Sequence, residues 1–111
     1  MNPTKLITAC AYARCSTLLK GQDPKLQIDQ IREFARARNY DLVSEFLDSA
    51  SGSNEKRPGL ADLVKNAKAG KFKVVICAGI DRISRSSKHL LNLVDELRHY
   101  GVYLISIREG L

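Results

Sequence analysis

Serine and arginine side chains gather in three short polar segments, each of which follows a run of apolar residues. The segments are residues 12–17, 48–52 and 81–85, and the first of them contains Arg14 and Ser16. A serine oxygen can attack phosphorus, and arginine forks can neutralise the charge that grows on the non-bridging oxygens without a metal ion. The residue types therefore indicate phosphoryl-transfer chemistry.

Other phosphate and hydrolytic chemistries lack the residues that they need. The sequence has no Gly-x-x-x-x-Gly-Lys segment followed by Ser or Thr, which a nucleotide-binding P-loop requires. A cysteine phosphatase needs an arginine at the position that Gly21 holds relative to Cys15, and a receiver domain needs an acidic pocket where the residues here are basic. His89 and His99 fall in the third predicted helix, away from the polar segments, which disfavours a Ser-His-Asp triad or a histidine metal site.

Apolar or β-branched runs alternate with helical patterns along the chain. The predicted elements are strands over residues 5–12, 42–47, 74–78 and 102–107, and helices over residues 24–39, 58–70 and 87–100. Strands that alternate with helices in this way form a parallel sheet covered by the helices. The sequence thus predicts an α/β fold: an open parallel sheet in a three-layer α/β/α arrangement, with a flavodoxin-like strand order.

Proline and glycine mark the ends of the predicted helices. Pro24 suits the first position of a helix behind Asp23 as its cap, and Gly101 can supply the left-handed residue that ends the third helix. Each helix has a predicted buried face. The faces are Leu26, Ile31, Phe34 and Ala35 in the first helix, Leu60, Leu63, Val64 and Ala67 in the second, and Leu90, Leu91, Val94 and Leu97 in the third.

The three polar segments should meet at one edge of the sheet, because the carboxyl ends of parallel strands lie together. Ligands of open α/β sheets bind beyond this edge, near the point where the strand order reverses. The side chains expected there are Arg14, Ser16, Ser51, Arg57, Arg82 and Arg85. The connection over residues 48–57 is longer than such a turn needs, so we expect it to be a mobile, functional loop.

Composition limits the class of protein more than it defines the function. The 111 residues are 44% hydrophobic and 27% charged, which predicts one compact domain. The net charge of +6 and a pI near 9.4 favour a polyanionic partner. No apolar run approaches the length of a membrane span and no signal peptide opens the chain, so the cytoplasm is the expected compartment. Cys10, Cys15 and Cys77 lack paired spacing, and we expect reduced thiols.

Two of the segments resemble the signature motifs of a known family. Residues 12–17 are similar to the motif around the nucleophile of the serine site-specific recombinases, the resolvases and DNA invertases. Residues 81–85 resemble their Asp-Arg-x-x-Arg segment, and the resemblance extends over residues 6–111 with the motifs in the same order and spacing. It implies an enzyme that cleaves and rejoins double-stranded DNA by two transesterifications. It also implies self-association to a dimer and a synaptic tetramer, with no metal, ATP or other cofactor and no membrane.

The resemblance assigns roles residue by residue. Ser16 would attack the scissile phosphate and form a 5′-phosphoserine link, leaving a free 3′-hydroxyl. Three arginines would contact that phosphate, namely Arg14, Arg82 and Arg85. The other positions carried over are Gln27 on the first helix, Tyr12 in the nucleophile motif, Asp48 and Ser51 in the Asp-x-x-Ser-Gly loop, and Arg57 before Gly59 and Leu60. The resemblance leaves two roles open for Asp81, which could orient an arginine or relay a proton to the leaving 3′-oxygen.

The chain departs from the family pattern in two places. Residues 77–79 are Cys-Ala-Gly, where the family commonly has a bulky aromatic and a basic residue, so a backbone or DNA contact is expected to be missing. We also expect residues 1–111 to be the resolvase-type catalytic domain alone, with the dimerisation helix and the DNA-binding region lying beyond Leu111. The competing hypothesis is a regulatory module of the same fold that binds DNA or recombinase subunits without catalysis. The presence of Ser16 with the three arginines favours the enzyme.

Overall fold

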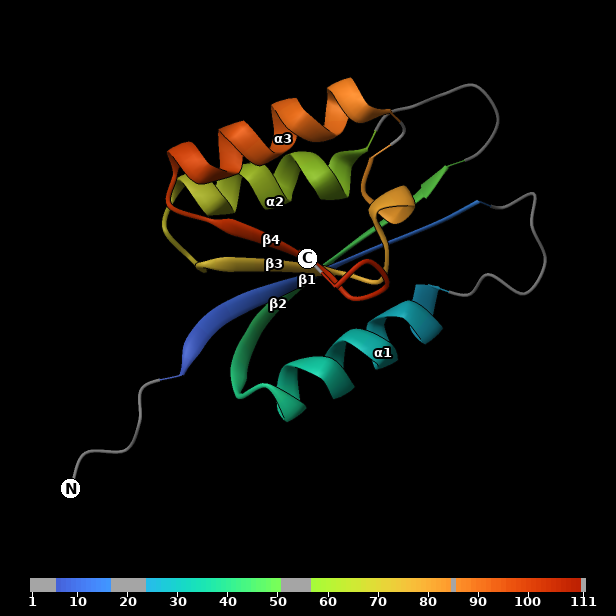
Figure 1. Ribbon diagram of the computed structural model, residues 1–111, viewed down its shortest axis with the longest axis vertical. Helices are drawn as coiled ribbons and strands as arrows, with labels where there is room; N and C mark the ends of the chain where they lie inside the picture. Colours follow the sequence, from blue (N-terminus) through green and yellow to red (C-terminus); the bar gives the residue numbers. More distant parts are fainter. Residues whose placement is uncertain (1–5, 17–23, 51–56, 85, 111) are drawn as a thin grey trace.

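The fold is a four-stranded parallel sheet in a computed structural model that describes residues 6–16, 24–50, 57–84 and 86–110 (Figure 1). The strands are β1 (Ile7–Ser16), β2 (Tyr40–Ala50), β3 (Val74–Cys77) and β4 (Tyr103–Ser106). They lie in the order β2-β1-β3-β4, and all three pairings are parallel. The chain leaves β1 towards β2 and returns to its other side with β3, so the strand order reverses at β1, as in flavodoxin-like sheets.

Helices cover both faces of this sheet (Figure 1). Helix α1 (Pro24–Ala37) lies on one face, and α2 (Pro58–Lys68) and α3 (Ser87–His99) lie together on the other. A short 3₁₀ helix, η1 (Ile80–Arg82), follows β3. These layers confirm the predicted three-layer α/β/α architecture.

The side chains of β1 alternate between the two cores, as the period of a strand requires. Ala9, Ala11 and Ala13 pack in the core under α1. Cys10 and Tyr12 pack in the other core, under α2 and α3. Small residues on one face and larger ones on the other let the middle of β1, residues 9–13, lie completely buried in the sheet.

Two predicted core positions are wrong. Leu26 is 62% exposed and Leu91 is 63% exposed, whereas Ile28 and Leu93 are buried instead. The cause is the rotational phase of each helix, because a helix buries positions three and four residues apart and a neighbouring position falls outside that stripe. The other predicted face residues are buried or half-buried, and Gly101 has the left-handed φ of 77° that was expected after α3.

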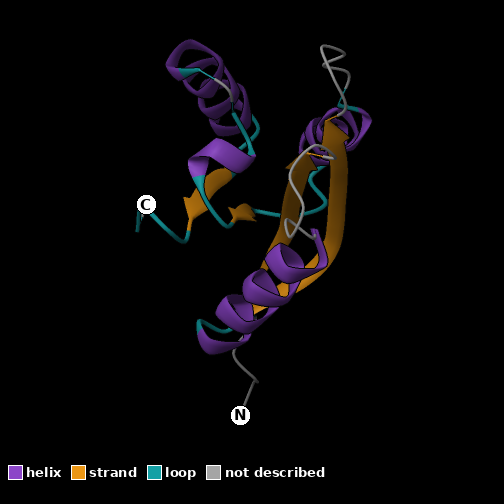
Figure 2. Cartoon of the chain, turned by 90° about the vertical axis from the view of Figure 1, so that its right-hand side faces the viewer, coloured by secondary structure: helices purple, strands orange, loops and turns teal. Residues whose placement is uncertain are grey.

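The strands β1 and β2 run further than the apolar pattern predicted. They pair along their whole length up to Ser16 opposite Ala50, whereas the last partner of β1 in β3 is Cys77, opposite Tyr12 (Figure 2). The residues 48–50 therefore belong to a strand rather than to the predicted loop, because backbone pairing with β1 holds them. The rest of that loop, residues 51–56, lies outside the described residues. Within the described part, no helix is long and apolar enough to cross a membrane.

Candidate active site at the carboxyl edge of the sheet

Tyr12 and Asp48 join the two long strands from the inside. The Tyr12 side chain is fully buried, and its hydroxyl donates to Oδ2 of Asp48 at 2.6 Å. Burial, together with this hydrogen bond to a carboxylate, raises the pKa of Tyr12 above its ordinary value. Tyr12 is therefore held as a neutral donor, and it fixes the Asp48 carboxyl group under the start of α2.

Asp48 caps α2 although it belongs to another element. Its Oδ1 accepts from the backbone N–H of Gly59 at 2.7 Å and its Oδ2 from that of Leu60 at 2.9 Å. Arg57, the residue before the helix, forms no side-chain cap of its own. A carboxylate at a helix N-terminus satisfies free N–H groups and favours the helix dipole. Asp48 thus sets the position of the helix start, and with it the position of Arg57.

Gly59 is required at this cap by space. A Cβ atom on Gly59 would lie 2.6 Å from the carbonyl oxygen of Leu47 and 2.9 Å from Oδ1 of Asp48. Real Cβ atoms do not approach other atoms this closely, so α2 rests directly on the end of β2. The contact between helix and strand therefore depends on the missing side chain.

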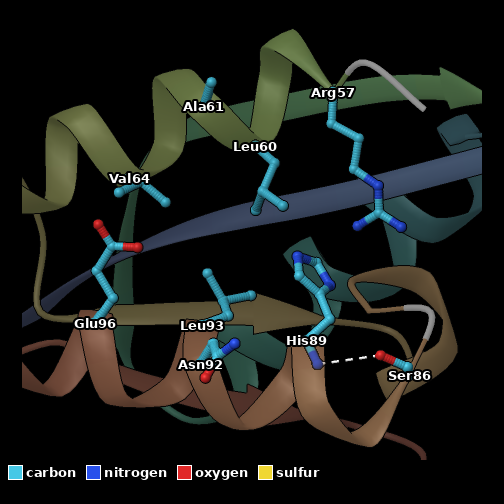
Figure 3. A pocket seen from close by; sticks show the side chains of 9 residues that line it. All are labelled: Arg57, Leu60, Ala61, Val64, Ser86, His89, Asn92, Leu93 and Glu96. Carbon is cyan, nitrogen blue, oxygen red and sulfur yellow. Dashed lines mark hydrogen bonds between the residues drawn. The ribbon is translucent and has the colours of Figure 1, made fainter. Parts of the chain in front are cut away.

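Arg57 points into the space between α2 and α3 (Figure 3). Its Nη1 donates to the carbonyl oxygen of Ile83 at 2.5 Å, while its Nη2 is buried and has no hydrogen-bond partner among the described residues. Burial and the nearby guanidinium of Arg14 lower the pKa of Arg57 from its ordinary value. A buried guanidinium nitrogen without an acceptor is one that an anionic ligand can satisfy.

Gln27 holds the end of β1 from the side of α1. Its Oε1 accepts from the backbone N–H of Arg14 at 3.2 Å, and its Nε2 donates to the Arg14 carbonyl at 2.8 Å. The amide thus bonds Arg14 as a neighbouring strand would, beyond the point where β3 has ended. Gln27 is 8% exposed, and it is the buried polar contact between α1 and the strand that ends in Ser16.

Asp81 lies in η1 at the same edge. Its direct partners are Arg108 and Arg82, and none of the residues described so far in this section contacts it directly in the described structure. Its Oδ1 accepts from Nη1 of Arg108 at 2.8 Å, and its Oδ2 is 3.9 Å from Nε of Arg82. Next to it, Ile80 donates its backbone N–H to Oε1 of Glu109 at 3.1 Å. Residues that follow β4 therefore hold η1 in place.

His89 corrects the expectation that both histidines lie away from the polar edge. Its Nδ1 is 3.2 Å from Oγ of Ser84, its backbone N–H donates to the Ser86 cap, and its ring lines the same pocket as Arg57 (Figure 3). The reason is topological, because the helix after a parallel strand begins at the carboxyl edge of the sheet. His99, in the last turn of α3, lies at the opposite end of that helix.

The structure brings together most of the predicted site residues that it describes. Tyr12, Asp48, Arg57, Arg14 and Gln27 are linked by hydrogen bonds or by the electrostatic effect of Arg14 on Arg57. Ser16 is the last residue of β1, two positions after Arg14, and its side chain lies outside the described part. Ser51 and Arg85 lie outside the described residues altogether.

Sequence reasoning missed Arg108 and Glu109. Both follow β4, so the rule that directed attention to the ends of the first three strands applies to them equally. The described residues contain no group of three or more His, Cys, Asp or Glu side chains that could hold a metal ion. Cys10 and Cys77 are buried free thiols, as expected for a chain without paired cysteines.

Comparison with known proteins identifies a family that matches almost the whole chain. The family model described as "Resolvase, N terminal domain" matches residues 9–111. The chain is 35% identical over 100 residues to the transposon Tn552 resolvase of Staphylococcus aureus. The matched residues make up 90% of this chain and 46% of that protein. It is 38% identical to the DNA-invertase of Escherichia phage P1, covering 90% of this chain and 48% of that protein.

Solved structures give the same answer. A resolvase family site-specific recombinase from Streptococcus pneumoniae superposes with a TM-score of 0.85 at 25% identity, covering 95% of this chain and 74% of that chain. The C-terminal catalytic domain of ISC1926 TnpA, an IS607-like serine recombinase, gives 0.81 at 30% identity, covering 91% and 67%. The fold and its edge define a flavodoxin-like α/β domain. This chain belongs to the resolvase family of serine recombinases. It spans about half the length of the curated relatives that it matches.

Proposed function

We propose that this chain is the catalytic domain of a site-specific recombinase that cleaves and rejoins double-stranded DNA through Ser16. One observation carries the proposal furthest. Arg57 has a buried Nη2 without a hydrogen-bond partner among the described residues, and its pKa is lowered in part by the guanidinium of Arg14, two residues before Ser16 on β1. A buried guanidinium nitrogen without an acceptor, near a second guanidinium, favours a bound phosphate.

The proposed reaction is a pair of transesterifications. The Ser16 oxygen forms a bond to the scissile phosphorus as the bond from phosphorus to the 3′-oxygen breaks. The serine hydroxyl gives up its proton and the leaving 3′-oxygen gains one, so the product is a 5′-phosphoserine link and a free 3′-hydroxyl. In the second step a 3′-hydroxyl from the recombination partner attacks the same phosphorus and releases the serine. Neither step consumes ATP or calls for a metal ion.

The remaining site residues have different roles in this scheme. Four arginines, Arg14, Arg57, Arg82 and Arg85, neutralise the phosphate oxygens in the transition state. Tyr12, Asp48 and Gln27 are positioning residues, because their hydrogen bonds join one element to another: Tyr12 of β1 to β2, Asp48 of β2 to α2, and Gln27 of α1 to β1. Ser51 belongs to the loop next to this edge, and Asp81 orients an arginine or relays the proton to the 3′-oxygen. The partners are duplex DNA and further copies of the protein, as a dimer and then a synaptic tetramer, and we expect the reaction to take place in the cytoplasm.

The deciding experiment uses the full-length protein that contains this chain and a duplex carrying its recombination site. In excess EDTA, the wild type should form a covalent adduct at DNA 5′ ends, and Ser16→Ala should form none while it still binds the site. Thr8→Ala, a substitution near the other end of β1, is the matched control and should form the adduct. An adduct that survives Ser16→Ala, or cleavage that requires added magnesium, contradicts the proposal. The catalytically silent alternative predicts binding with no adduct from the wild type.

A further inference from the structure

We infer that Arg108 is a positioning residue of this site, which holds Asp81 and, through it, Arg82 at the carboxyl edge of the sheet. The inference rests on the proposed function, because it concerns the same DNA-cleaving site. Arg108 follows β4, which is the strand furthest from β2 in the sheet.

The Asp81 carboxylate lies between two arginines and offers one oxygen to each. Oδ1 accepts from Nη1 of Arg108 at 2.8 Å, and Oδ2 is 3.9 Å from Nε of Arg82. The contact with Arg108 is therefore the close one, and it fixes the rotation of the carboxylate. The direction in which Oδ2 faces Arg82 follows from that rotation.

The backbone of Arg108 is held firmly beside η1. Its N–H donates to the carbonyl oxygen of Ala78 at 3.0 Å, and the preceding Ile107 donates to that of Cys77, also at 3.0 Å. Glu109 then accepts from Ile80 and from the hydroxyl of Ser106. The residues that follow β4 thus continue its pairing with β3 and bring Arg108 alongside Asp81.

Gly79 provides the space in which Arg108 lies. A Cβ atom on Gly79 would be 2.9 Å from Cζ of Arg108 and 2.8 Å from Oδ1 of Asp81. The φ of Gly79 is −162°, an extended conformation that any residue adopts, so backbone freedom is not the reason for a glycine here. The ion pair lies across the glycine, in the volume that a side chain at position 79 would occupy.

The departure from the family pattern at residues 77–79 therefore has a structural counterpart. The cation at this point of the edge comes from position 108, and the glycine at position 79 leaves the space in which it lies. The ion pair between Arg108 and Asp81 is more than half exposed on both sides, at 55% and 57%. An exposed pair contributes little to the free energy of unfolding. Its main effect is therefore to orient the Asp81 carboxylate towards Arg82.

The first arm of the test measures cleavage by the full-length protein. In a single-turnover reaction with duplex DNA, Arg108→Ala should lower the rate constant for adduct formation by about 10- to 100-fold, the scale of a misplaced catalytic group. The dissociation constant for DNA should stay close to that of the wild type. The matched control is Arg36→Ala, which removes another exposed arginine paired with a carboxylate, Glu33, at the last turn of α1. A wild-type rate for Arg108→Ala, with an active wild type, overturns the inference.

The second arm tests whether positions 79 and 108 share one space. Gly79→Lys should lower the midpoint of denaturation in the presence of Arg108 and much less in the Arg108→Ala background, where only the Asp81 carboxylate remains close to the added Cβ and, released from Arg108, can turn away. The double variant Gly79→Lys/Arg108→Ala should also cleave faster than Arg108→Ala, since it returns a cation to Asp81. Additive effects on the midpoint overturn the inference.

The denaturation measurements of this arm need no DNA, so the two proposals fail separately. A wild type that forms no adduct contradicts the proposed function, while the coupling between positions 79 and 108 is still measured. Strong coupling in stability without recovery of cleavage in the double variant also counts against the inference, because it reduces Arg108 to a packing residue.

Discussion

The side-chain amide of Gln27 forms two hydrogen bonds with the backbone of Arg14, accepting from its N–H at 3.2 Å and donating to its carbonyl at 2.8 Å. Helix α1 is thereby tied to the strand β1 two residues before Ser16. Gln27 is the only proposed site residue on α1, and its contact joins this helix to the strand that ends in Ser16, the proposed nucleophile.

Replacement of Gln27 should therefore affect cleavage through the geometry of β1. Gln27→Glu keeps the shape and one acceptor but loses the donor to the Arg14 carbonyl, and Gln27→Ala loses both contacts. We expect both variants to form the covalent adduct more slowly, by about 10-fold or more, because the nucleophile is displaced. Gln30→Ala, an exposed amide in the same helix, is the control and should behave as the wild type. Equal rates for all three variants would remove Gln27 from the site.

Arg57 should require its planar guanidinium and not only its charge. One of its terminal nitrogens, Nη1, is committed to the Ile83 carbonyl, and Nη2 is buried without a partner in the described structure. Arg57→Lys keeps the charge but cannot make both contacts. We expect its cleavage rate constant to fall by about 100-fold, as for a lost transition-state donor. Arg38→Lys, in which the exchanged side chain lies over the Phe34 ring, is the control. A rate within twofold of wild type for Arg57→Lys would show that charge alone suffices.

The architecture could be predicted from the sequence because the strands and helices depend on short-range patterns of residues. Apolar runs with helices between them predicted the parallel sheet, and the polar segments after the first three strands predicted the edge at which the candidate site lies. The features that the sequence did not predict depend on contacts between elements that are distant along the chain. Asp48 caps α2 from β2, eleven residues before Gly59, whereas sequence rules look for a cap just before the helix. Arg108 lies across Gly79 because β3 pairs with β4, and this too is a contact between distant parts of the sequence.

Gly59 should be among the least replaceable residues outside the chemistry itself. Alanine is ordinarily favoured over glycine in a helix by about 1 kcal/mol. At position 59, however, the added methyl group would meet the Leu47 carbonyl at 2.6 Å. We expect Gly59→Ala to lower the free energy of unfolding by about 1–3 kcal/mol, the usual cost of overpacking. Urea denaturation measures it.

The matched control for Gly59→Ala reverses the exchange on the same helix. Ala61 is exposed, so Ala61→Gly should cost only the helix propensity of about 1 kcal/mol. If Gly59→Ala stabilises the protein, the close approach of α2 to β2 is not present in solution. The adduct assay should follow the same order as stability, since Arg57 stands two residues before Gly59.

The buried thiols should make the protein less stable at high pH. Burial raises the pKa of Cys77 from 9.0 to about 12, and it raises that of Cys10 as well. Between pH 9 and 12 the unfolded chain loses the Cys77 proton while the folded chain keeps it, so the folded state binds more protons and the free energy of unfolding falls as pH rises. The stabilisation is fully present below pH 9, and the limiting slope is about 1.4 kcal/mol per pH unit for each thiol.

Urea denaturation of a Cys15→Ser background at pH 8 and at several values above pH 9 measures this slope, with Cys15 removed because its side chain lies outside the described part. Cys77→Ala in the same background is the control, and it should reduce the pH dependence because one of the two shifted thiols is gone, while Cys10 and Tyr12 remain. Iodoacetamide gives an independent check, since alkylation proceeds through the thiolate. Cys10 and Cys77 should react in urea and resist the reagent in the native protein. Rapid alkylation of both thiols in native buffer, or an unchanged slope in Cys77→Ala, would contradict the burial of these side chains in the core under α2 and α3.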